Sequence, residues 1–72
     1  MNTNKPKLLD VVALLHDIPG EIFLRGQVGT IVEVYPEGYE IEFVDDDGKT
    51  IGLKTVRETE IIVLHYNLAE VA

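Results

Sequence analysis

The sequence contains no cysteine and no serine, and both absences limit what this chain can do. Without cysteine it has neither the disulfide framework of small secreted domains nor a thiolate site for a metal. Without serine and cysteine it lacks the two commonest side-chain nucleophiles. Its apolar runs are also far shorter than a membrane span. We therefore expect no membrane association, a cytoplasmic location by default, and a fold held together by apolar packing.

The chain of 72 residues is 46% hydrophobic, which suits one folded domain near the lower size limit. Residues 1–7 are polar and contain no apolar core of the kind that a signal peptide carries. We expect a short loose arm over residues 1–7, a domain over residues 8–65 and a tail over residues 66–72. Stability is expected to come from packing or from association with another chain.

Short runs rich in β-branched and aromatic residues predict five strands. The clearest lies between two turn signals, where Tyr39, Ile41 and Phe43 alternate with Glu40 and Glu42. Such a period of two places bulky side chains on a buried face and carboxylates in water. The first run could also be a helical turn, but its length and context favour a strand. The five predicted strands are Leu8–Leu15, Val28–Tyr35, Tyr39–Val44, Thr50–Val56 and Ile61–His65.

The connections between these runs predict how the strands are joined. Pro36 and Gly38 fit a tight turn, and the Asp-Gly pair in Asp45–Lys49 is a hairpin signal. Residues 57–60 are predicted to form one helical turn, while residues 16–24 carry Pro-Gly punctuation and form a long ordered loop. Four large apolar residues of that loop are expected to be hidden against the core: Ile18, Ile22, Phe23 and Leu24.

Glycines mark the start of the second strand. Gly26 and Gly29 flank Val28 there, and glycine permits a positive φ, a bulge or a close backbone approach at a barrel corner. Five short strands, one long first loop, two tight hairpins and a single turn before the last strand follow the order of an SH3-like barrel. We therefore predict an all-β fold, a small five-stranded SH3-like barrel with a short 3-10 turn before the last strand.

Three segments carry a family resemblance: Leu8–Leu14, Arg25–Val34, and Tyr39–Asp45 with Asp47-Gly48 after it. Together they closely resemble a family of small bacterial proteins known as domain of unknown function 4926, over roughly Leu8 to His65. The resemblance implies an SH3-like barrel without an established activity, and it supplies no catalytic residues. A more distant similarity runs to KOW-type modules, but this chain lacks their basic loop.

The candidates for chemistry are few. His16 and His65 are the only histidines, and either would need a nearby carboxylate to act as a base. Asp45–Gly48 invites a calcium interpretation, but Phe43 and Lys54 would occupy essential ligand positions of an EF-hand loop. A hairpin turn explains those aspartates better. We expect no enzyme, no cofactor and no metal site.

Tyrosines are candidates for an aromatic contact surface. Tyr39 shares its face with Ile41 and Phe43, which favours core packing. Tyr35 and Tyr66 remain as candidates for the surface.

Acidic side chains are the one functional signal that remains. The net charge is −7, and the stretch from residue 33 to residue 47 contains seven acids and no base. A solubilising face is the plain interpretation. Our functional hypothesis is a protein-binding accessory, an antitoxin-like or immunity-like companion, that covers a basic partner surface. The proposed binding residues are Glu33, Glu37, Glu40, Glu42, Asp45, Asp46 and Asp47.

Two other kinds of partner stay open. A KOW-like nucleic-acid module would need the fold to gather Arg25, Lys54 and Arg57, and the negative charge argues against it. A homodimer could form if the barrel closes incompletely, because the last strand or the tail could then pair with a second copy.

Overall fold

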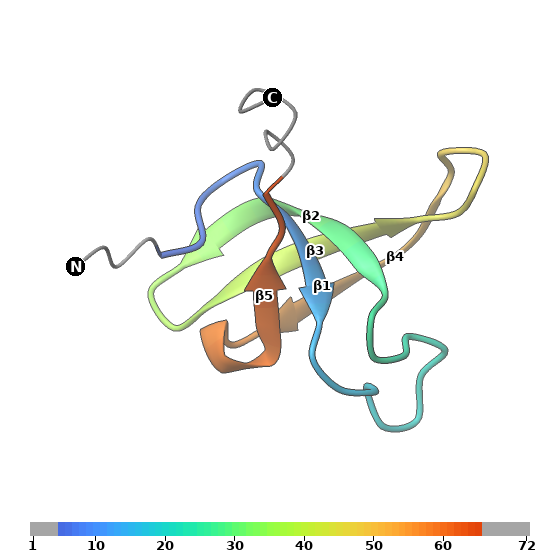
Figure 1. Ribbon diagram of the computed structural model, residues 1–72, viewed down its shortest axis with the longest axis horizontal. Helices are drawn as coiled ribbons and strands as arrows, with labels where there is room; N and C mark the ends of the chain where they lie inside the picture. Colours follow the sequence, from blue (N-terminus) through green and yellow to red (C-terminus); the bar gives the residue numbers. More distant parts are fainter. Residues whose placement is uncertain (1–4, 66–72) are drawn as a thin grey trace, which may run out of the picture.

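The computed structural model describes residues 5–65, which form one antiparallel sheet of five strands (Figure 1). Its strand order is β4-β3-β2-β1-β5. The prediction of an all-β SH3-like barrel with a 3-10 turn before the last strand is confirmed. No helix in this part of the chain has the length and hydropathy needed to cross a membrane. The elements are β1 (Val11–Leu14), β2 (Val28–Tyr35), β3 (Gly38–Val44), β4 (Thr50–Val56), the 3-10 turn η1 (Glu58–Glu60) and β5 (Ile61–Val63).

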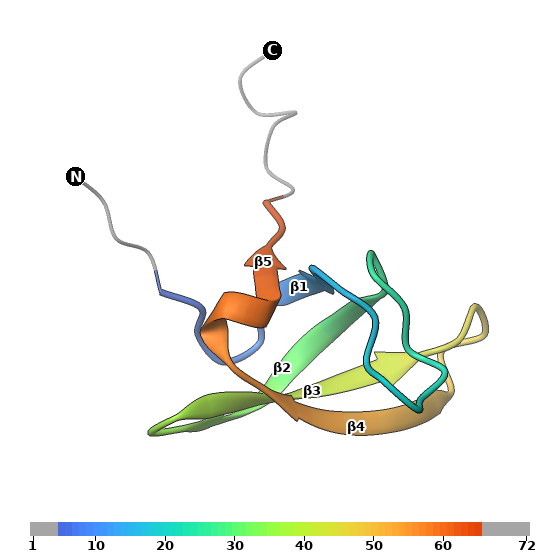
Figure 2. The same cartoon turned by 90° about the horizontal axis from the view of Figure 1, so that it is seen from below.

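The sheet curls on itself, so that β1 and β5 lie across from β3 and β4 (Figure 2). The long strand β2 joins the two halves by pairing with both β1 and β3. Register shifts between Ile31 and Glu33, and between Phe43 and Val44, mark the irregular points in the ladders. Bulges of this kind increase local bending and twist. The buried core comprises Val12, Leu14, Phe23, Ile31, Tyr39, Ile41, Phe43, Val56 and Ile61.

The two glycines at the start of β2 have different roles. Gly26 has a φ of +89°, so it supplies the left-handed conformation that turns the chain into the strand. Gly29 lies where a Cβ atom would be 2.5 Å from Ile41 Cγ2 and 2.8 Å from the backbone oxygen of Glu42. The fold therefore needs glycine at residue 29 because the strands approach too closely for a side chain.

The first loop covers the barrel with Phe23, and Ile18 packs partly against the same core. The Phe23 ring is buried and stacks on Phe43 with the ring centroids 4.6 Å apart, and it lies over Gly52. The expectation that all four apolar loop residues are hidden is wrong, because Ile22 and Leu24 are 71% and 56% exposed. Backbone hydrogen bonds from Ile18 to Phe23 and from Gln27 to Leu24 hold this segment so that the Phe23 ring is buried and Ile18 packs partly against the core.

The first strand begins later than predicted, at Val11 rather than Leu8. The Asp10 carboxylate accepts hydrogen bonds from the backbone nitrogen and the Nζ atom of Lys7, at 2.9 and 3.0 Å. Burial raises the pKa of Asp10, but these bonds outweigh it and the pKa is lowered overall. The turn they close places Leu9 at a φ of +74°. The hydrogen bonds to the Asp10 carboxylate therefore favour a turn over a strand at Leu8 and Leu9. They also attach Lys7, at the end of the predicted arm, to the domain.

Candidate functional site

The seven predicted partner-binding acids do not form one patch. Glu37 lies in the turn between β2 and β3, whereas Asp45, Asp46 and Asp47 lie in the hairpin between β3 and β4 (Figure 1). These turns are at opposite ends of the seven-residue strand β3, roughly 20 Å apart at the usual rise per residue. A single rigid partner contact on both turns would have to span the length of the sheet.

Three of the acids share the outer face of the sheet. Glu40 and Glu42 alternate with the buried residues of β3 and so point outward. Glu33 of β2 lies directly opposite Glu40 in the register. The register shift between Ile31 and Glu33 makes this possible, because in a regular strand residue 33 would share the inward face of Ile31. The bulge therefore creates a cross-strand pair of like charges.

None of the seven acids is paired with a base within residues 5–65. The four ion pairs there involve other acids: Asp10, Glu21, Glu58 and Glu60. Two of the seven accept hydrogen bonds from neutral side chains: Glu40 from the Tyr35 hydroxyl at 2.7 Å, and Glu42 from the Thr50 hydroxyl. The bond to Glu40 is the main cause that raises the pKa of Tyr35. No base in residues 5–65 therefore neutralises the carboxylates of the outer face.

Asp45 has a structural role in its hairpin. Its carboxylate accepts hydrogen bonds from the backbone nitrogens of Asp47 and Lys49, at 2.8 and 2.9 Å, and Gly48 follows with a φ of +83°. Aspartate and glycine thus shape the turn for backbone reasons, as the sequence predicts. Residues 5–65 contain no group of three or more acidic or histidine side chains placed to hold a metal ion.

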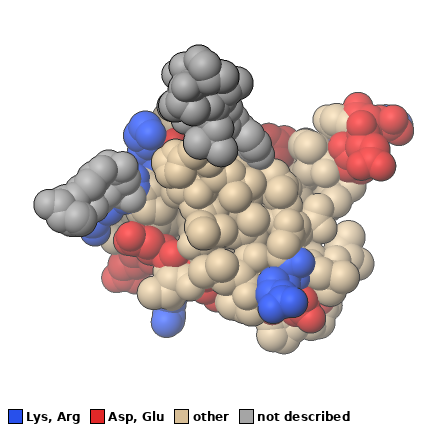
Figure 3. Space-filling model, in the orientation of Figure 1, with Lys and Arg blue, Asp and Glu red and all other residues tan. Residues whose placement is uncertain are grey.

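Of the three bases proposed for nucleic-acid binding, Lys54 has its side chain held by other contacts. Lys54 Nζ lies 2.7 Å from the Glu21 carboxylate and 5.8 Å from the centroid of the Phe23 ring. The backbone nitrogen of Arg25 donates to Asp17. On the face shown in Figure 3, the basic side chains form separate small areas. This face offers no continuous basic strip along which a phosphate backbone could run.

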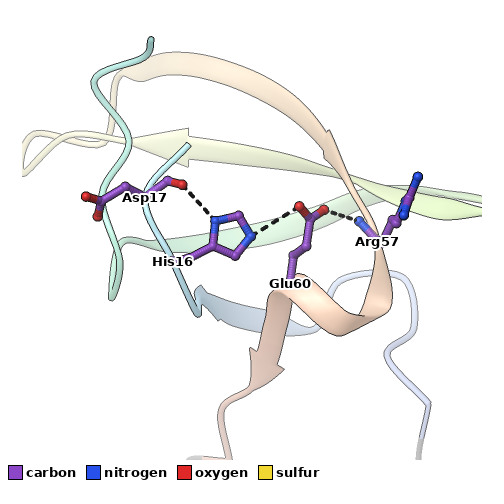
Figure 4. A network of polar contacts seen from close by, with 4 residues as sticks. All are labelled: His16, Asp17, Arg57 and Glu60. Atoms are coloured by element: carbon purple, nitrogen blue, oxygen red, sulfur yellow. Dashed lines mark hydrogen bonds and ion pairs between the residues drawn. The ribbon is translucent and has the colours of Figure 1, made fainter. Parts of the chain in front are cut away.

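His16 lies beside a carboxylate, which sequence reasoning named as the condition for a base. Its Nε2 atom is 3.2 Å from Glu60 Oε2, and its Nδ1 atom is 2.7 Å from the backbone oxygen of Asp17 (Figure 4). The hydrogen bond to Asp17 and then the contact with Glu60 raise the pKa of His16. Glu60 also accepts a hydrogen bond from the backbone nitrogen of Arg57. The exposed pair thus links the first loop to η1.

An uncharged surface over β1 and β5 is a feature that the sequence pattern did not reveal. Ala13 is paired with Val28 on one side and with Ile62 on the other. All three alternate with buried neighbours and face outward, and Val28 and Ile62 are about half exposed. Figure 3 shows this side of the molecule without charge across its centre. The apolar side thus begins at Val28, at the start of β2, whereas the acidic residues lie further along β2 and on β3.

A small pocket lies at the turn between β2 and β3. Its volume is about 160 Å³, and its walls come from three separate parts of the chain. Tyr35, a predicted surface aromatic, is 41% exposed and lines it, whereas Tyr66 lies outside the described residues. Sequence reasoning missed this pocket because its residues come together only in the folded domain. The lining residues are Lys5, Tyr35, Pro36, Glu37, Gly38, Tyr39 and Glu58.

Comparison with known proteins gives a family but no function. Searches of curated proteins and of solved structures each found no significant match. Residues 8–63, the greater part of the chain, match a family described as Domain of unknown function (DUF4926). The match covers every strand of the sheet and confirms the resemblance drawn from the sequence. This chain therefore belongs to the DUF4926 family.

Proposed function

We propose that this protein is a non-catalytic protein-binding module whose acidic outer face, formed by Glu33, Glu40 and Glu42, covers a basic surface of its partner. One observation carries the proposal: none of these carboxylates is paired with a base in residues 5–65, and Glu33 faces Glu40 directly. Directly opposed like charges destabilise a sheet. A basic partner would relieve that repulsion and would be attracted over a distance.

The uncharged side over β1 and β5 adds a second kind of contact. Hydrophobic side chains supply much of the affinity of protein interfaces, while complementary charge sets specificity and the rate of encounter. A partner that reached around the barrel would find both surfaces. The antitoxin-like or immunity-like role, in a bacterial cytoplasm, is our specific form of this proposal.

The test compares two charge reversals of equal size. The first variant carries Glu40→Lys and Glu42→Lys on the sheet face, and the second carries Asp46→Lys and Asp47→Lys at the hairpin tip. Each is used to capture proteins from the native host, and the captured proteins are quantified by mass spectrometry against the unaltered chain. We expect the same basic protein with the unaltered chain and with the hairpin variant, and its loss with the sheet-face variant.

Two results would contradict the proposal. Equal capture of the same protein by all three chains would show that the acidic face does not take part in binding. Capture by none of them, at low ionic strength where charge attraction is strongest, would remove the basic partner altogether. Measured binding of RNA or DNA that weakens steeply with added salt would favour the KOW-like alternative instead.

A further inference from the structure

The pocket at the turn between β2 and β3 has the chemistry of a site for a positively charged side chain. Its lining is mostly polar and includes Tyr35, Pro36 and Tyr39, and its charged residues are Glu37, Glu58 and Lys5. Carboxylates attract a cation and accept hydrogen bonds from it. An anion would meet two negative charges there, and a neutral apolar group would leave them without a partner.

The size of the pocket fits one cationic head group. Its volume of about 160 Å³ is more than ten times the minimum that holds one water molecule. A guanidinium or an ammonium with its last methylene groups needs space of this order. Tyr35 is oriented there because its hydroxyl donates a hydrogen bond to Glu40 at 2.7 Å. The Tyr35 side chain is thus held in place before any ligand arrives.

A cation of the chain itself already lies at this pocket. Lys5 lines it and approaches Glu58, with Nζ 3.9 Å from Oε1. Both side chains are well exposed, at 77% and 49%, so the contact contributes little to stability. A stronger cation with better geometry would displace it easily. Lys5 therefore indicates which ligand chemistry the pocket accepts, and it also competes for the site.

We propose that this pocket binds an arginine or lysine side chain of the partner protein, and that Lys5 is its internal competitor. The inference rests on the proposed function, because it identifies where a basic partner would insert one side chain. Glu37, which lies outside the cross-strand pair, gains a role in this pocket. Recognition would then combine one inserted cation with the broader attraction of the acidic outer face.

The test uses small probes in place of the partner. The ¹⁵N-labelled protein is titrated with N-acetyl-arginine amide and, in parallel, with N-acetyl-citrulline amide, a neutral ligand of the same shape. We expect the arginine probe to shift the backbone signals of Gly38, Tyr39 and Glu58, with millimolar affinity. The citrulline probe should leave those signals in place at the same concentrations. Equal shifts with both probes, or none with either, would overturn the proposal.

Variants then separate the pocket from overall charge. Lys5→Ser should tighten binding of the arginine probe by up to about fivefold, the factor that corresponds to removing one exposed ion pair. The control Lys49→Ser removes the same charge from the far hairpin and should change the affinity by much less. An equal gain in affinity from both variants would mean that only the net charge matters. That result would overturn the role of Lys5 as a competitor.

Loss of binding is tested in the same way. Glu37→Gln combined with Glu58→Gln should weaken the arginine probe at least threefold, whereas Asp46→Asn combined with Asp47→Asn should not. The dispersion of the backbone signals reports in each titration that the variant is folded. Because these probes need no partner, their failure would leave the sheet-face test of the proposed function standing. If instead the probes bind and the sheet-face variant captures its partner unchanged, the pocket proposal would stand and the proposed acidic interface would not.

Discussion

Removing one charge from the Glu33–Glu40 pair should make this protein more stable. The most informative change is Glu33→Gln, because Glu40 would keep the hydrogen bond that it accepts from the Tyr35 hydroxyl. Glu33 itself accepts no side-chain hydrogen bond and forms no ion pair within residues 5–65. The substitution therefore removes a repulsion and no attractive contact that the structure shows.

The size of the effect follows from the register. Residues directly opposite in an antiparallel pair have Cβ atoms about 5 Å apart. Two unit charges at that distance in water repel by about 0.8 kcal/mol. Measured cross-strand effects are about 0.2–1 kcal/mol, so we expect a gain in that range. For a domain of this size, the gain should raise the melting temperature by about 1–8 °C.

The assay is urea unfolding followed by circular dichroism, at low salt and again in 1 M NaCl. The matched control is Asp46→Asn, which changes the net charge equally but lies at the tip of the far hairpin. At 1 M salt the Debye length is about 3 Å, so most of the gain should disappear. The gain is refuted if Glu33→Gln is no more stable than the control. If the gain in stability is the same in 1 M NaCl, its cause is not the repulsion between charges.

The remaining predictions concern packing and pH. Gly29→Ala should destabilise the fold by about 1–3 kcal/mol in urea unfolding, because its Cβ would lie 2.5 Å from Ile41 Cγ2. A cost below about 0.5 kcal/mol, the range of ordinary surface changes, would show that the strands can separate there. Hydrogen bonds to Asp17 and Glu60 raise the pKa of His16, so its stabilising effect should be complete below its ordinary value near 6.5 and disappear as the pH rises through the raised pKa. The unfolding midpoints of the unaltered chain and of His16→Gln should therefore differ at pH 5.5 and converge at pH 8.5, and a constant difference would contradict this account.

Local patterns were enough to predict the elements of this fold. Alternation in Tyr39–Val44, the Asp-Gly signal at residue 47 and the acidic turn before Ile61 each act over a few residues. Two strands, β2 and β4, have the predicted bounds. The difference between the predicted and the observed start of β1, Leu8 and Val11, also has a local cause. There the Asp10 cap competes with strand propensity, and only the geometry of the chain decides between them.

The candidate sites depended on contacts between distant residues. His16 and Glu60 are 44 positions apart, and the pocket joins residues 5, 35–39 and 58. These residues meet only because the sheet curls and brings η1 near the first loop and the turn between β2 and β3. No local sequence pattern specifies that arrangement. The exposure of Ile22 and Leu24 has the same origin, because the folded loop places the Phe23 ring over Gly52 and leaves these two side chains outside the core.

The sequence by itself determined an acidic all-β domain with five short strands, since composition and alternation act residue by residue. The tertiary structure alone decided which acids meet. Glu33 is two residues beyond the buried Ile31, and side chains two residues apart share one face of a regular strand. A regular strand would therefore point Glu33 inward. The bulge at Val32 reverses that direction and places Glu33 opposite Glu40 on the outer face, because one extra residue in one strand changes the face of every side chain beyond it.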